Sequence, residues 1–223
     1  MSVTSYNRTI NIQLRNFILL NFEGDNVTQN RIEQIQTLFS ESPGILRSSE
    51  MLKHGICSKD LKELEEAGLI TRLKDGYYTW ASMLDDLSDS YIATATIPDA
   101  TICDISAAAY YNLTTVIPDA VHVRVPNKGK KPQPPLYPPV QITQEKEPGF
   151  SLGRICASGK SPIYDIERTV CDCIKHKSDF GTDIALEILK NYMSGPHNLQ
   201  KLYSYAEAMR IHTVIHPYVE AMI

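Results

Sequence analysis

Residues 55–80 read GICSKDLKELEEAGLITRLKDGYYTW and decide the fold of the first part of the chain. Ser58 is placed to cap a helix, because its hydroxyl can accept a hydrogen bond from the free amides of the first turn. Gly68 stands where a glycine ends a helix. Two runs rich in branched and aromatic residues follow, and Asp75-Gly76 between them is a strong hairpin-turn signal. The stretch predicts a capped helix followed by a two-stranded wing.

Two more helices are expected before this stretch. Apolar residues recur at helical spacing from Ile32 to Phe39, and the pattern stops at residues 42–44, which read SPG. A short helix from residue 48 or 49 to 54 is then closed by Gly55. Three helices and a hairpin in this order, within about fifty residues, predict a winged helix-turn-helix.

The remainder of the chain mixes strand and helix patterns and ends as helices. We expect helices at 84–91 and 105–113, strands at 121–125, 140–143 and 152–157, and closing helices at 165–176, 184–192, 199–209 and 214–222. The proline-rich segment 127–140 is expected to be a surface loop or an extended arm, since proline lacks a backbone donor. The predicted fold class is α+β, a winged helix-turn-helix followed by a mixed α/β domain with a helical C-terminus. The predicted domains are an N-terminal extension (1–26), the winged helix (27–81) and the α+β domain (82–223).

Composition excludes several classes of protein. The 22 Lys and Arg residues are outnumbered by 26 Asp and Glu, so a general polyanion-binding protein is excluded and any DNA contact must come from a local patch. The five cysteines are odd in number and unevenly spaced, which favours reduced thiols over a disulfide framework. No apolar run approaches the ~20 residues of a membrane span, and the first ten residues do not form a secretory signal. We therefore expect a cytoplasmic protein.

The third helix is the expected DNA-reading element, because the second helix of a helix-turn-helix pair enters the major groove. With Leu61 and Leu64 toward the core, its outward face carries Lys59, Lys62, Glu63 and Glu66, and Ser58 opens it. Phosphate contacts are expected from Arg47, Lys53, Arg72 and Lys74, with Tyr77 packed near the DNA backbone.

Two alternatives to DNA binding stay open at this point. Residues 27–80 carry seven Lys/Arg against eight Asp/Glu. This absence of a positive net charge also suits protein docking or a purely structural role. If DNA is the ligand, a homodimer or paired sites would be needed, because few phosphate contacts per module give little affinity.

The sequence supports no catalytic residues, metal site or cofactor. Cys171 and Cys173 point about 200° apart on a helix, so they cannot share a metal with His176, and Cys156 adds no C-x-x-C pair. Residues 158–161 read SGKS but lack the first glycine of a phosphate loop, so a polar turn between strands is expected. The histidines pair with no Ser or Cys nucleophile.

One dense polar cluster remains. Its members are Asp165, Glu167, Arg168, Thr169 and Asp172. Arg168 and Asp172 are four residues apart and can pair on one helix face, while Asp165 favours a helix start. An ion-paired structural anchor is the simpler interpretation, and recognition of a partner or a catalytic role are the alternatives.

The chain resembles the AbiEi antitoxins of type IV toxin–antitoxin, abortive-infection systems. The resemblance rests on the winged-helix run 55–72 with GYY at 76–78, on SAAAYYNLT at 106–114, on HVRVP at 122–126 and on YDIERTVCD at 164–172. It covers about residues 30–223. It implies a winged helix that binds inverted repeats upstream of its own operon and represses it. It also implies a C-terminal domain, not itself an enzyme, that counteracts a cognate nucleotidyltransferase-like toxin.

Overall fold

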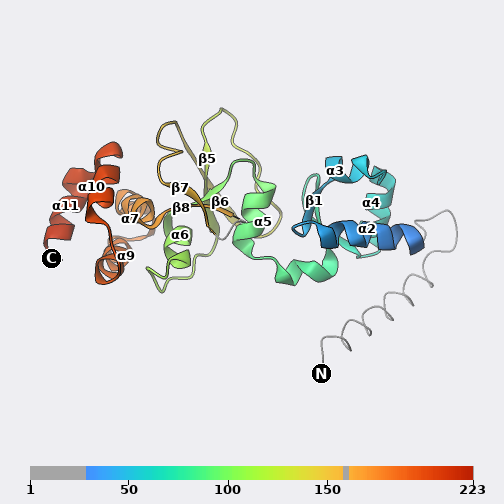
Figure 1. The fold of residues 1–223 in the computed structure, drawn as a ribbon, viewed down its shortest axis with the longest axis horizontal. Coiled ribbons are helices and arrows are strands. Elements are labelled where there is room, and N and C mark those ends of the chain that lie inside the picture. The colour runs from blue at the N-terminus through green and yellow to red at the C-terminus, as the bar shows by residue number, and fades with distance from the viewer. Residues whose placement is uncertain (1–28, 158–160, 223) are drawn as a thin grey trace, which may run out of the picture. The chain divides into compact units, whose positions relative to one another are not determined.

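The computed structural model describes residues 29–157 and 161–222 (Figure 1). The expected N-terminal extension, residues 1–26, lies outside the described residues, as do the first three residues of the SGKS segment. The chain divides into two compact units with the boundary after Asp86. Each unit is considered by itself below.

The first unit is a winged helix. Its elements are α2 (Gln29–Glu41), β1 (Ile45–Arg47), α3 (Ser48–Lys53), α4 (Ser58–Glu66), β2 (Ile70–Lys74), β3 (Tyr77–Trp80) and a 3₁₀ helix η1 (Ala81–Asp86). The strands form an antiparallel sheet in the order β1-β3-β2. Strand β1 was not expected, because three residues are too short to show an alternating pattern. Strand β1 forms because the edge of β3 that does not pair with β2 is open to a third strand.

A continuous apolar core holds the three helices on the sheet. Ile35 and Phe39 of α2, Leu64 of α4 and Trp80 of β3 are all buried, and the rings of Phe39 and Trp80 lie 5.9 Å apart. Burying one such side chain contributes roughly 1.5–3 kcal/mol. The buried hydroxyl of Thr79 donates to the carbonyl of Gly44 at 2.7 Å, so its polar group is satisfied.

The predicted N-cap of α4 is wrong by one residue. Cys57 is the N-cap and Ser58 is the first helical residue. The amide of Cys57 donates to Asp60 Oδ2 at 2.9 Å, which is the reciprocal half of a capping box. The glycine end is as predicted, since Gly68 follows the C-cap with φ +69°, a conformation that costs a residue with a Cβ about 1–2 kcal/mol.

The second unit places a mixed sheet beside a helical bundle. Its elements are α5 (Asp89–Thr96), β4 (Thr101–Ile102), α6 (Asp104–Tyr110), β5 (Val121–Pro126), β6 (Val140–Glu145), β7 (Arg154–Ala157), β8 (Ser161–Tyr164), α7 (Ile166–Lys175), α8 (Lys177–Phe180), α9 (Thr182–Ser194), α10 (Leu199–Ala208) and α11 (His212–Glu220). The sheet order is β6-β5-β4-β8-β7, with β5·β6 and β4·β8 parallel and the other pairs antiparallel. The α+β fold class is therefore confirmed.

Several element boundaries differ from the predicted ones. The helix expected at 84–91 is wrong: η1 occupies 81–86, and α5 starts only after Ser88, whose hydroxyl accepts from the amide of Tyr91 at 3.3 Å. The helix expected to reach residue 113 ends at Tyr110, and Asn112 turns the chain at φ +56°. Strand β4 was not expected, since a run of two residues carries no readable period, and β8 was implied only as the strand after the SGKS turn, without bounds. The loop expected at 127–140 connects β5 to β6, with Val140 already in β6.

Helix α7 is the centre of the second unit. Every residue from Glu167 to Ile174 is buried, because the helix packs against α6, α9 and α10. Val170 and Ile174 join an apolar cluster that continues through Ile188, Leu202 and Ile215 of the last three helices. Figure 1 shows α7, α9, α10 and α11 gathered at one side of the sheet. No helix within the described residues has the length and apolar character to cross a bilayer.

Candidate nucleic-acid interface and a buried charge cluster

The outward face of α4 carries the two lysines expected to face DNA. Lys59 and Lys62 have side chains that are 69% and 77% exposed. Their ammonium groups lie 3.7 Å from Glu63 and Glu66, four residues on. Glu63 was expected on the outward face, but its side chain is only 17% exposed. Exposed pairs of this kind contribute about 0.3–0.5 kcal/mol each, so a phosphate can replace the carboxylate.

A groove of about 680 Å³ lies where α4 faces the wing. Three expected DNA-binding residues line it, namely Ser58, Lys62 and Arg72, and Ser48 joins them from the start of α3. Arg72 is ion-paired with Asp75 in the wing turn. The tertiary structure thus gathers hydroxyl and cationic groups from three elements along one concave surface, which Glu65 and Glu66 of α4 also line.

Arg47, Lys74 and Tyr77 form a second group on the wing. Arg47 and Lys74 flank Tyr77 across the sheet, with their charged groups 5.1 and 5.7 Å from its ring centroid. Partial burial lowers the pKa of Lys74, an effect that Asp75 opposes and Arg47 reinforces. Lys53 stands apart from both groups, exposed at the end of α3.

The second unit contains a buried cluster of charged side chains around Arg124. Its members are Asp104, Arg124, Glu145, Arg168, Asp172 and His176. Arg124 Nη2 donates to both oxygens of Asp104 at 3.1 Å, and its Nη1 donates to Asp172 at 2.8 Å. Arg168 Nε also donates to Asp172, at 3.1 Å. The two guanidinium groups share Glu145, and both lie over the ring of Tyr164.

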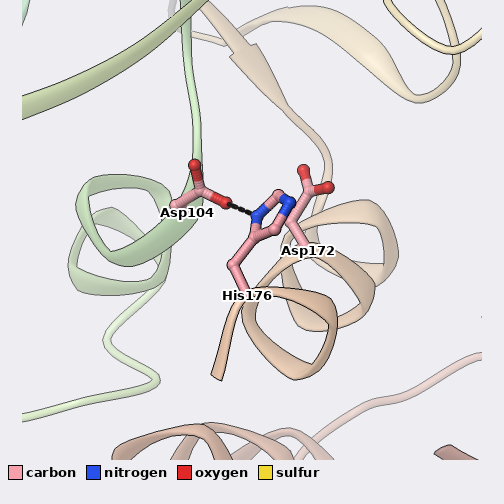
Figure 2. A group of neighbouring side chains, drawn as sticks. All are labelled: Asp104, Asp172 and His176. Atoms are coloured by element: carbon pink, nitrogen blue, oxygen red, sulfur yellow. Dashed lines mark hydrogen bonds and ion pairs between the residues drawn. The ribbon is translucent and has the colours of Figure 1, made fainter. Parts of the chain in front are cut away.

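Asp104 and His176 meet at the edge of this cluster. Figure 2 shows the imidazole of His176 directed at the Asp104 carboxylate, with Nδ1 and Oδ1 2.9 Å apart. Burial would raise the pKa of Asp104, but the hydrogen bond with His176 and the charge of Arg124 outweigh it and lower that pKa. The same hydrogen bond raises the pKa of His176 against the opposing effect of burial. Asp104 also adopts φ +49°, a strained value for a residue with a Cβ.

Asp104, Asp172 and His176 are close enough to be considered as metal ligands. One ligand atom from each lies within 4.8 Å of the others. However, Arg124 already bridges the two carboxylates, and a divalent cation would meet that guanidinium at close range. The donor set is thus occupied by an arginine. Oδ1 of Asp172 is buried without a hydrogen-bond partner, and burial raises the pKa of this carboxyl despite the neighbouring arginines.

A polar cavity of about 300 Å³ opens next to the cluster. Asp104, His122, Arg124 and His176 line it, together with side chains from β6 and α8. Sequence reasoning did not select Asp104, His122, Arg124 or Glu145. The one available signal was Arg124 itself, a charged residue between two valines in a strand.

The five residues of the predicted polar cluster are all buried, and most of their polar atoms bond within the second unit. They are Asp165, Glu167, Arg168, Thr169 and Asp172. Asp165 caps α7 through the amide of Arg168 at 2.9 Å and also accepts from Tyr205. Glu167 pairs with Lys201 at 2.9 Å, and the hydroxyl of Thr169 donates to the Asp165 carbonyl. The predicted Arg168–Asp172 pair is present. These bonds support the structural alternative for the segment.

The cysteines considered as metal ligands lie on two elements, β7 and α7. Cys171 and Cys173 are buried within α7, and Cys156 is exposed on β7. Ser161 begins β8, which pairs with β7 in the antiparallel sense, while residues 158–160 of the SGKS segment lie outside the described residues.

Among known proteins, a solved structure has a fold similar to that of this chain. No family model and no curated protein matches this sequence. The solved structure of the RV2827C protein from Mycobacterium tuberculosis is similar, with a TM-score of 0.54 at 13% identity. The match covers 82% of this chain and 73% of that chain. At this identity the likeness shows the fold alone.

Proposed function

We propose that this protein is an antitoxin and autoregulating transcriptional repressor of the AbiEi type, which binds operator DNA through its winged helix. The observation that carries the proposal is the groove between α4 and the wing, where Ser58, Lys62 and Arg72 converge. Lys59, one turn from Lys62, extends the cationic edge along the exposed face. In a winged helix this is the surface that meets the major groove and its phosphates.

The first unit has nearly equal numbers of basic and acidic residues, which limits the affinity of one copy for DNA. Each lysine of α4 has an intrahelical glutamate 3.7 Å away, so phosphate contacts compete with weak ion pairs. One module therefore neutralises few phosphates and has modest affinity. Inverted repeats that hold two copies of the chain supply the rest, since linked binding events multiply affinity.

Fluorescence anisotropy tests the repressor proposal. The full chain is titrated onto the DNA upstream of its own gene and onto scrambled DNA, at two salt concentrations. We expect selective binding that weakens with salt, and its loss in the double variant Lys59→Glu/Lys62→Glu. The matched control is Lys146→Glu/Lys190→Glu, which changes the net charge equally at exposed positions of the second unit.

The control separates two readings of a lost signal. If both double variants bind less well to the same extent, the effect is one of overall charge and α4 is not the reading element. Unchanged affinity of the α4 variant for upstream DNA would overturn the proposal.

The antitoxin role belongs to the second unit by resemblance. The resemblance implies a nucleotidyltransferase-like toxin in the same operon, and its expression with and without this protein measures neutralisation as restored growth. Co-purification of the two chains then distinguishes direct contact from action on the toxin's substrate or modification. Continued toxicity in the presence of the folded protein would contradict the antitoxin role and leave a stand-alone regulator.

Protein docking is the second candidate function for the winged helix. Leu52 on α3 has 64% of its surface exposed, and the ion pairs of α4 leave little unbalanced positive charge. An exposed apolar side chain on the first unit suits a protein partner better than DNA. Equal or absent binding to both DNAs in the anisotropy experiment would favour this function.

A further inference from the structure

The last helix carries two histidines one turn apart. His212 and His216 occupy positions i and i+4 of α11, and their ring centroids are 5.2 Å apart. Two histidines at this spacing on one helix face are a recurring chelate for divalent transition metals. Two imidazoles on one tetrahedral ion, each nitrogen at about 2.1 Å, place their ring centroids roughly 5 Å apart. The two rings of His212 and His216 already lie at about this centroid separation.

The surroundings of the pair restrict the two rings. Tyr203 of α10 lies 5.3 Å from the ring of His212 and 5.7 Å from that of His216, and it is stacked on the latter. This aromatic contact holds both imidazoles beside each other before any ligand arrives, which reduces the ordering cost of binding. The hydroxyl of Tyr203 is buried without a hydrogen-bond partner, so this corner of the unit has an unused polar group.

The same helix face also has the charge that a cation prefers. Glu220 lies one turn beyond His216, and its Oε1 is 3.8 Å from Nε2 of that histidine. Side-chain exposures of 45% and 59% leave His216 and Glu220 accessible to an ion from solvent. Around Asp104 and His176, by contrast, an arginine fills the space between the carboxylates.

We propose that His212 and His216 form a chelate site for a divalent transition-metal ion of the zinc, nickel and copper class. Imidazole nitrogens suit these ions, and the remaining coordination positions are open to water. Binding ties the first two turns of α11 together. Because Ile215 and Val219 of this helix are buried in the core of the unit, the ion stabilises the folded state. This inference is independent of DNA binding.

Isothermal titration of the untagged full chain with zinc, and separately with nickel, tests the site. We expect one ion per chain, an affinity at least about tenfold weaker in His212→Ala and in His216→Ala, and a smaller loss in Glu220→Gln. Zinc should raise the melting temperature of the wild-type chain and leave that of His216→Ala unchanged. The matched control is His197→Ala, which removes an exposed histidine from the α9–α10 connection.

Copper provides a spectroscopic check on the ligands. Electron paramagnetic resonance of the copper-loaded chain should show coupling to two imidazole nitrogens, and one fewer in His216→Ala. If binding survives in His212→Ala/His216→Ala but is lost in His176→Gln, the ion sits in the charge cluster and the proposal is wrong. Absence of binding by the folded wild-type chain would equally overturn it.

Discussion

The charge balance of the buried cluster depends on one proton. Asp104, Glu145 and Asp172 face only two guanidinium groups, so a protonated His176 completes the balance. Its hydrogen bond to Asp104 raises the pKa of His176 above its ordinary value near 6.5. A raised histidine pKa contributes stability that is fully present below the unfolded pKa and is lost as pH rises through the folded pKa.

Removal of this proton site changes the pH dependence of unfolding. We expect His176→Gln to lower the free energy of unfolding most at mildly acidic pH, with the difference from wild type shrinking as pH rises through the folded pKa of His176. Urea titrations followed by far-UV circular dichroism across that range measure this difference. His197→Gln serves as the control, and a difference that grows with pH would contradict the assignment.

Gly153 is a residue at which space and backbone both exclude a side chain. It has φ +72°, and a Cβ there would lie 2.7 Å from Cβ of Arg168. We expect Gly153→Ala to lose about 2–4 kcal/mol, from the left-handed backbone and from overpacking. Gly68→Ala is the control with a similar φ and no atom within 4 Å, so it should lose only about 1–2 kcal/mol. Equal losses in denaturant titrations would show that the contact with Arg168 is unimportant.

At the scale of elements, the start of α4 depends on Asp60 and not on Ser58. The Asp60 carboxylate accepts from the amide of Cys57, whereas Ser58 is already inside the helix. We expect Asp60→Ala to lose on the order of 1 kcal/mol and Ser58→Ala to change stability little. Asp60→Asn keeps an acceptor and should lie between them. Fluorescence of Trp80 during urea unfolding measures all three, and a larger loss in Ser58→Ala would restore the serine cap.

At the scale of the whole molecule, each compact unit buries apolar clusters of its own, and we expect the two units to unfold separately. Trp80 is the single tryptophan and lies in the core of the first unit, while most of the described helices lie in the second unit. Arg124→Met leaves two buried carboxylates without their shared guanidinium, which typically costs about 3–5 kcal/mol. We expect this variant to shift the unfolding transition seen by circular dichroism and to leave the Trp80 transition in place. An equal shift in both signals would mean that the chain unfolds as one unit.

The elements that could be predicted are those whose signals are local. Gly55, Gly68 and Asp75-Gly76 mark ends and turns by their own backbone preferences, so the order of the winged helix was readable. The Arg168–Asp172 pair was readable because four residues make one helical turn. Strands β1 and β4 and the bounds of β8 were not, because short strands are set by the edges they pair with. Arg124 was passed over because its partners lie 20 or more positions away.

The sequence by itself determined the α+β class, the helix–wing order of the first unit and the exposed lysines of α4, since periodicity, caps and turns act over a few residues. Only the tertiary structure decided what those residues meet. It brought Ser58, Lys62 and Arg72 to one groove, placed Arg124 between Asp104 and Asp172, and set Tyr203 against the two histidines of α11. Contacts of this kind follow from packing between distant segments, where the hydrophobic burial of whole elements fixes which polar groups come together.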